Sequence, residues 1–169
     1  MNNMGSVKLQ ENKPVESIIG EYLIKNKLTI ATAESCTGGL LAGRLINYPG
    51  ISSSFLEGMV TYSNEAKQRR LGVRKETLER HGAVSRETAL EMACGIAQAA
   101  DADIGISTTG IAGPGGGTSE KPVGLVYVGV CIKGRASCME LRLSGDRQQV
   151  RSSTVNKALE YLKSQLMDK

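Results

Sequence analysis

The segment GLVYVGVCI, residues 124–132, is apolar at almost every position. A strand with one face in water alternates apolar and polar residues, whereas a strand covered on both faces reads as a continuous apolar run. Residues 124–132 therefore predict an internal strand of a sheet that has helices on both faces. The segment RASCMELRL, residues 135–143, follows after a short turn and is its expected hairpin partner.

Earlier in the chain, helical and extended patterns alternate. Apolar residues at helical spacing predict helices over residues 14–27, 40–46 and 85–100. We also expect a polar helix over residues 64–71 and a short helix over residues 75–80. Asp146 and Gln149 form a capping-box pattern for a final helix. Extended runs predict strands over residues 28–33, 55–63 and 102–109.

This order of elements predicts an α/β protein. Strands interleaved with helices, followed by one late β-hairpin, indicate a three-layer α/β/α sandwich on a mixed, mostly parallel sheet. We expect residues 1–13 to form a disordered tail and residues 14–169 to form a single domain.

The composition narrows the classes of function. Hydrophobic residues make up 40% and charged residues 22% of the 169 residues, which is typical of a globular domain. The net charge of +4 suits an anionic small ligand, but the chain lacks the basic stripe with stacking aromatics that nucleic-acid binding favours. No apolar run reaches the length of a membrane span, and no apolar signal-peptide core precedes the domain. We therefore expect a cytoplasmic protein that binds neither nucleic acid nor membrane.

The four cysteines, at positions 36, 94, 131 and 138, show no CxxC pair. The single histidine, His81, offers no second imidazole, so we expect no metal site. We expect reduced, structural thiols in a reducing compartment. If Gly134 and Arg135 form the tip of a two-residue hairpin loop, Cys131 and Cys138 lie opposite each other on the two strands.

Three polar segments directly follow predicted strands: residues 34–39, 61–67 and 108–117. In open α/β sheets, ligands bind outside the carboxyl ends of the strands. If the first three strands are parallel, these segments meet at one end of the sheet. This convergence indicates a candidate site.

The first segment, ESCTGG, places Ser35 and Cys36 at a turn from a strand into a helix. A hydroxyl there would lie beside unpaired backbone N–H groups that can stabilise an oxyanion. A thiol at a helix N-terminus can also be a nucleophile of low pKa. The alternative is structural: Ser35 or Thr37 caps the helix, and Gly38 and Gly39 permit tight packing.

The second segment supplies Tyr62 and Lys67. A serine nucleophile needs a base, and the polar surroundings of His81 argue against a Ser-His-Asp triad. A lysine kept neutral by desolvation, or helped by a tyrosine, can take that role. The alternative is that Lys67 belongs to a solvated face with Arg69 and Arg70.

The third segment, TTGIAGPGGG, is dense in backbone amides, which can cradle phosphate or carboxylate. It is neither a Walker motif nor a dinucleotide fingerprint. Arg147 begins the final helix and could add a positive charge to an anion site. The alternative for Arg147 is a surface ion pair with Asp146 or Glu140.

Taken in order, TAESCTGG, GMVTYSNEAK, GAVSRETA, TTGIAGPGGG, EKPVGLVYVGV and SGDR resemble the C-terminal domain of CinA over about residues 15–165. The resemblance implies a CinA-like amidase domain in its stand-alone, PncC-type form. It implies hydrolysis of the carboxamide of nicotinamide mononucleotide to nicotinic acid mononucleotide and ammonia, a step of pyridine nucleotide salvage. No metal or organic cofactor is expected. Small α/β enzymes of this kind often dimerise, so we expect a homo-oligomer.

The resemblance also assigns roles to residues. The nucleophile of the family falls on Ser35, and its partners fall on Tyr62 and Lys67. Lys67, directly or through Tyr62, is expected to remove the Ser35 proton, while the backbone near Cys36 and Thr37 holds the oxyanion. The expected substrate-binding residues are Glu34, Cys36, Thr37, Gly38, Gly39, Thr109, Gly110, Gly113, Gly115, Gly116 and Arg147.

Three alternatives to this function stay open. One is a nucleotide-binding regulatory module without turnover. Another is a competence- or DNA-damage-linked interaction protein, which only the family's name suggests. The third is an amidase that acts on a different nucleotide.

Overall fold

The computed structural model describes residues 13–167. The expected tail, residues 1–13, lies outside the described residues except for Lys13. Within residues 13–167, no helix combines the length and the apolar character needed to cross a bilayer.

Helices and strands alternate through most of the chain, as the sequence predicts. In order they are α1 (Val15–Asn26), β1 (Ile30–Glu34), α2 (Leu40–Leu45), a short 3-10 helix η1 (Ile51–Ser53), β2 (Phe55–Val60), α3 (Asn64–Leu71), α4 (Lys75–His81), α5 (Arg86–Ala99), β3 (Ile104–Gly110), β4 (Leu125–Ile132), β5 (Arg135–Arg142) and α6 (Arg147–Met167).

The strands form one five-stranded sheet in the order β2-β1-β3-β4-β5. The β1 strand pairs in parallel with both β2 and β3, while β4 pairs antiparallel with β3 and β5. The sheet is therefore mixed, with its parallel part at the β2 edge and the late hairpin at the other edge. The continuous apolar run of β4 is explained by α5 and α6, which contact this strand from opposite faces of the sheet.

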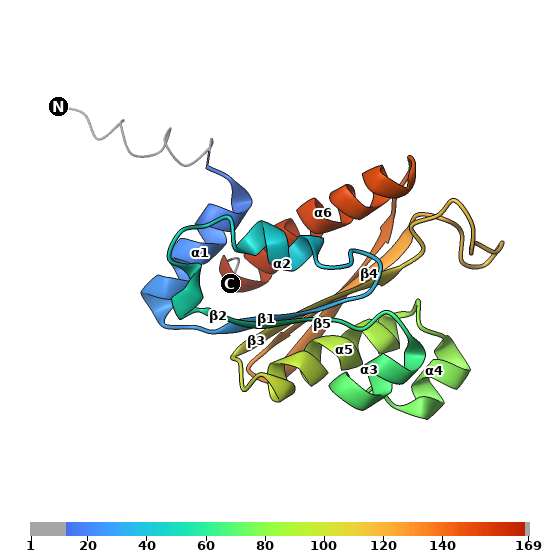
Figure 1. The fold of residues 1–169 in the computed structure, drawn as a ribbon, viewed down its shortest axis with the longest axis horizontal. Helices are drawn as coiled ribbons and strands as arrows, with labels where there is room; N and C mark the ends of the chain where they lie inside the picture. The colour runs from blue at the N-terminus through green and yellow to red at the C-terminus, as the bar shows by residue number, and fades with distance from the viewer. Residues whose placement is uncertain (1–12, 168–169) are drawn as a thin grey trace.

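Helices cover both faces of the sheet, which confirms the three-layer α/β/α architecture. Figure 1 shows α1, α2 and α6 on one face and α3, α4 and α5 on the other. Every residue of β1 is buried between these layers. The α5 helix lies so close to β3 that a Cβ atom on Gly105 would stand 1.9 Å from the carbonyl oxygen of Ala93.

The predicted register of the hairpin is wrong by one position. The turn consists of Lys133 and Gly134, with φ angles of 48° and 80°. A two-residue turn with positive φ at both central residues matches the twist of the flanking strands, which favours it over the expected tip. Cys131 therefore pairs with Ala136, and Cys138 pairs with Gly129.

All four cysteines are free thiols, as expected. The closest partner of Cys131 is on another element: its Sγ lies 2.9 Å from Sγ of Cys94 on α5. Burial raises the pKa of the Cys94 thiol to about 12, so it stays protonated near neutral pH.

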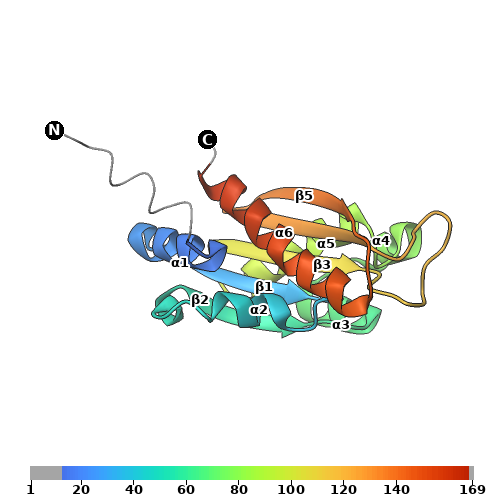
Figure 2. The same cartoon turned by 90° about the horizontal axis from the view of Figure 1, so that it is seen from above.

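The carboxyl ends of β1, β2 and β3 lie at one end of the sheet. The loop between β3 and β4 projects from this same end, and α6 begins there (Figures 1 and 2). The fold thus brings the three polar segments together.

Candidate active site

The centre of the site is a direct contact between Ser35 and Lys67. Ser35 follows β1, and Lys67 lies on α3, which Ser63 caps by accepting a hydrogen bond from the N–H of Ala66. Lys67 Nζ lies 3.1 Å from Ser35 Oγ and 2.8 Å from the carbonyl oxygen of Thr61. The side chains that were expected to cooperate are therefore within proton-transfer distance.

Lys67 lies in a dry environment without a carboxylate partner. It is only 1% exposed, and none of the ion pairs among residues 13–167 involves it. Burial lowers the pKa of the Lys67 ammonium, because an apolar environment disfavours the charged form. The alternative of a solvated face is wrong for Lys67, although Arg69 and Arg70 beside it are exposed.

The Cys36 thiol, next to Ser35, lies in surroundings that do not favour reactivity. Cys36 is 5% exposed and packs in an apolar cluster with Ala112, Val126 and Val150. Burial raises the pKa of the Cys36 thiol to about 12. Since the thiolate is the nucleophilic form, this environment keeps Cys36 unreactive at neutral pH.

Glu34 lies beneath the site and caps the short helix α2. Its carboxylate accepts hydrogen bonds from the backbone N–H groups of Gly39, Leu41 and Ala42 at 2.8–3.0 Å. It also accepts from the Thr37 hydroxyl at 2.5 Å. The residue at the N-cap position of α2 is Gly39, so the structural alternative, a cap by Ser35 or Thr37, does not form. Because the Glu34 side chain is 1% exposed and fully engaged, it holds the loop that carries Ser35.

That loop is also held from α6 by Arg151, which was not among the predicted site residues. Arg151 Nε donates to the carbonyl oxygen of Cys36, and Nη2 donates to that of Thr37, each at 3.0 Å. A signal was present: Arg151 follows Arg147 by four residues in a predicted helix, so both project from the same helix face.

Tyr62 lies at the exposed edge of the site, here called the rim, together with Arg147. No hydrogen bond joins Tyr62 to Ser35 or Lys67. It is 62% exposed, and its hydroxyl accepts a hydrogen bond from Arg147 at 3.0 Å. Thr61 is buried between the exposed residues Val60 and Tyr62, which is the alternation expected along an extended backbone. Lys67 meets Ser35 directly, and no contact among the described residues places Tyr62 between them.

Arg147 joins Tyr62 to the glycine-rich loop. Its Nη1 atom donates to the carbonyl oxygen of Gly113 at 2.8 Å. The ion pairs that were considered as alternatives do not form: Glu140 pairs with Arg142, and Asp146 caps α6 in a reciprocal arrangement with Gln149. The predicted capping box is thereby confirmed.

The glycine-rich loop has a buried base and an exposed tip. Thr109 is buried and donates to the carbonyl oxygen of Ala83 at 2.7 Å. Gly110 is packed so tightly that a Cβ atom would lie 2.5 Å from Val126. In contrast, Gly115 and Gly116 are exposed. Thr109 and Gly110 shape the base of the loop, and Gly115 and Gly116 at its tip face solvent.

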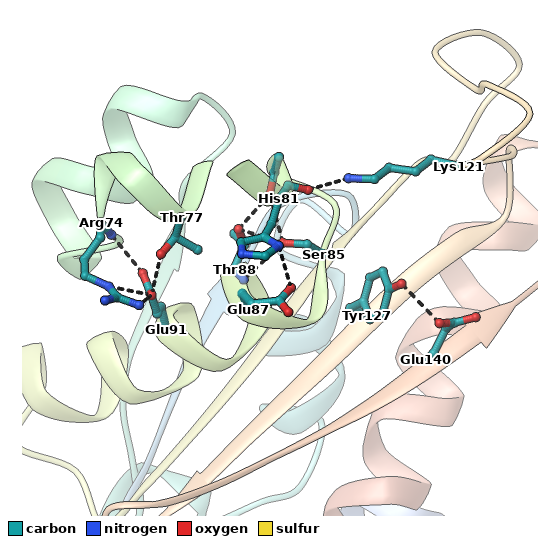
Figure 3. A network of polar contacts seen from close by, with 11 residues as sticks. Arg74, Thr77, His81, Ser85, Glu87, Thr88, Glu91, Lys121, Tyr127 and Glu140 are labelled. Atoms are coloured by element: carbon teal, nitrogen blue, oxygen red, sulfur yellow. Dashed lines mark hydrogen bonds and ion pairs between the residues drawn. The ribbon is translucent and has the colours of Figure 1, made fainter. Parts of the chain in front are cut away.

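The far side of this loop is tied to α4. Figure 3 shows Lys121 reaching the backbone of His81, to whose carbonyl oxygen it donates a hydrogen bond. The His81 ring itself faces Glu87, with 3.7 Å between Nδ1 and the carboxylate. The only histidine of the chain is thus part of this contact network and is not a partner of Ser35.

The sequence of this chain is similar to known proteins over almost its whole length. A family described as the CinA C-terminal domain matches residues 12–166. The chain belongs to this family. A Clostridium novyi protein named for competence-damage induction is 66% identical over 155 residues, which cover 92% of this chain and 37% of that protein. A similarly named Clostridium acetobutylicum protein is 64% identical, with 91% and 38% covered. The chain thus spans less than two fifths of the length of these relatives.

Solved CinA-type structures have the same fold. The CinA superfamily protein of Klebsiella pneumoniae superposes with a TM-score of 0.88 at 37% identity and covers 92% of this chain and 97% of its own. The competence/damage inducible protein CihA of Agrobacterium tumefaciens gives 0.83 at 43% identity, with 90% and 96% covered.

The site of this CinA domain combines several groups that can take part in chemistry. Among residues 13–167, no group of three or more His, Cys, Asp or Glu side chains is arranged to hold a metal ion. The site offers a hydroxyl, a desolvated amine, backbone N–H groups after Ser35 and a rim with Arg147. This set is suited to acyl transfer.

Proposed function

We propose that this CinA domain is an amidohydrolase that converts nicotinamide mononucleotide to nicotinic acid mononucleotide and ammonia. The observation that carries the proposal is the 3.1 Å contact between Ser35 Oγ and the buried Nζ of Lys67. A lysine whose pKa is lowered by burial can act as a general base near neutral pH, and a serine becomes a nucleophile when a base takes its proton.

In the first half of the reaction, neutral Lys67 removes the proton of Ser35, and Oγ attacks the carboxamide carbon. The N–H groups of Cys36 and Thr37 donate no hydrogen bond to other described residues, and we assign them to the developing oxyanion. The C–N bond then breaks, the Lys67 ammonium returns its proton to the leaving nitrogen, and ammonia departs from the acyl-serine.

In the second half, water attacks the ester of Ser35. Lys67 again takes a proton, now from the water, and returns it to Oγ when the ester bond breaks. The carboxylic acid product is released and the starting state is restored. Because only neutral Lys67 begins either half, we expect the rate to rise with pH through the lowered pKa of Lys67.

The choice of substrate rests on the family resemblance and on the rim. Arg147, the exposed tip of the glycine-rich loop and the net charge of +4 all favour an anionic ligand such as a nucleotide. We place the phosphate or ribose at this rim, with the carboxamide at Ser35.

The test is to incubate the purified protein with nicotinamide mononucleotide and a chelator, and to follow ammonia and nicotinic acid mononucleotide. We expect turnover that Ser35→Ala lowers by about 1,000-fold or more, while Cys36→Ala stays within a few-fold of wild type. Turnover that survives in Ser35→Ala but is lost in Cys36→Ala would reassign the nucleophile. Nucleotide binding without ammonia release would instead favour a regulatory module.

A further inference from the structure

Arg151 is an arginine beside the site whose charge has no carboxylate partner. None of the ion pairs among residues 13–167 includes it. Its guanidinium instead donates to two successive backbone carbonyl oxygens, those of Cys36 and Thr37. The Thr37 oxygen also accepts from the N–H of Leu40, whereas the Cys36 oxygen has Arg151 as its donor.

This contact fixes the direction of one peptide group. The only cis peptide bond among the described residues is Gly113–Pro114, so the bond between Cys36 and Thr37 is trans. In a trans peptide the C=O and N–H groups point in opposite directions. Since the Cys36 oxygen points to α6, the N–H of Thr37 points away from α6.

The direction away from α6 is the side on which the chemistry lies. Figure 1 shows α6 and α3 on opposite faces of the sheet. The hydroxyl of Ser35 is held by Lys67 of α3. Arg151 therefore holds the loop from one face, and the N–H of Thr37 is presented toward the other.

The side chain of Thr37 does not compete for this N–H group. Its hydroxyl donates to Glu34 and lies 2.7 Å from the hydroxyl of Thr108. The carbonyl oxygen of Ser35 is likewise occupied, by the N–H of Gly38. The backbone after Ser35 is thus fixed at each polar group except the two N–H groups of Cys36 and Thr37.

We propose that Arg151 is a positioning residue for the oxyanion donors of this site. It donates hydrogen bonds to the carbonyl oxygens of Cys36 and Thr37. It thereby orients the Thr37 N–H toward the carbonyl oxygen of a substrate whose carbonyl carbon Ser35 attacks. This inference rests on the proposed amidase function and adds to it a residue that touches neither the substrate nor Ser35.

The test compares Arg151→Met with Lys157→Met. Lys157 lies on the same helix and forms an exposed ion pair with Glu160, so its replacement removes an equal charge without touching the loop. Removal of one oxyanion donor costs about 100- to 1,000-fold in kcat. We expect Arg151→Met to lose about 100-fold in kcat with KM within about threefold of wild type, and Lys157→Met to match wild type.

Arg151→Lys keeps the charge but cannot donate a planar fork to two oxygens. We expect its kcat to remain at least about tenfold below wild type, and it carries the test if Arg151→Met does not fold. An Arg151→Met enzyme with unchanged kcat, or a loss confined to KM, would overturn the inference. The second outcome would mean that Arg151 binds substrate itself.

A second readout separates this inference from the choice of substrate. The acetyl group of p-nitrophenyl acetate transfers to a serine with release of p-nitrophenol, and the acylated peptide identifies the residue by mass. If wild type acetylates Ser35 but leaves nicotinamide mononucleotide intact, the substrate proposal fails and Arg151→Met must still acylate about 100-fold more slowly. Equal acylation rates overturn the role of Arg151, and a wild type that reacts with neither compound overturns both proposals.

Discussion

At the scale of single residues, Lys67 is the most unusual side chain of the molecule. Lysine is almost never fully buried unless it is paired, because desolvation of its ammonium is costly. Here its acceptors are uncharged, the Thr61 carbonyl and the Ser35 hydroxyl. Two neutral acceptors satisfy the hydrogen bonds of the amine without stabilising its charge as a carboxylate would. The arrangement therefore favours the neutral form of the Lys67 amine, which can accept a proton.

The sequence predicted this pair better than it predicted the residues around it. Ser35 and Lys67 each follow a strand in the parallel part of the sheet, so topology alone brings them to the same end. The roles of Glu34 and Arg151 could not be predicted in this way. Both depend on how a short loop packs against α2 and α6. The spacing from Arg147 indicates the helix face of Arg151, but it does not indicate which loop Arg151 contacts.

Tyr62 gives a prediction that separates a rim residue from a proton relay. Tyr62→Phe removes the hydroxyl that accepts from Arg147, which is worth about 1 kcal/mol. We expect KM to rise up to about fivefold and kcat to stay within about twofold of wild type, as steady-state ammonia release will show. A relay through Tyr62 would instead lower kcat by about 100-fold or more.

At the scale of elements, the pattern of helices and strands was predictable and one turn was not. Amphipathic spacing and apolar runs identified the segments, with ends displaced by a few residues. The hairpin register failed because it depends on Lys133 adopting a positive φ of 48°, which the residue type does not favour. The twist of β4 and β5 imposes this conformation on the turn.

Close packing of α5 on β3 gives a prediction at this scale. In Gly105→Ala the new methyl group would meet the carbonyl oxygen of Ala93, so α5 must move. We expect a loss of about 3 kcal/mol in the free energy of unfolding, measured by urea denaturation.

The matched control is Gly43→Ala in α2, where a Cβ atom meets nothing within 4 Å. Alanine favours the helix there, so we expect a gain of about 0.5–1 kcal/mol. If both variants lose equal stability, the tight approach of α5 to the sheet is not the cause.

At the scale of the whole molecule, the buried lysine couples stability to pH. The unfolded chain binds the Lys67 proton more tightly than the folded protein, because burial lowers the pKa of Lys67 in the fold. Stability rises with pH wherever the unfolded state binds more protons. The destabilisation from this group is therefore complete below the folded-state pKa, and it disappears as the pH approaches the pKa of an unfolded lysine.

Lys67→Met removes this titration and abolishes the base. We expect about 1,000-fold lower turnover, and we expect the unfolding free energy of wild type to gain on that of the variant as pH rises above neutrality. Urea denaturation of both proteins across this range measures the difference, in which titrations shared by the two proteins cancel. A difference that stays constant with pH would contradict a lowered pKa for Lys67.

Arg147 and Arg151 stand one helical turn apart on α6 and grip two different loops, one at Gly113 and one at Cys36. Because both arginines belong to one helix, α6 fixes the distance between the place proposed for the phosphate or ribose and the Oγ atom of Ser35. If the proposed function is correct, α6 determines which length of substrate fits between the two positions. Analogues that lengthen or shorten the link between phosphate and amide would then be rejected for their span, whatever their charge.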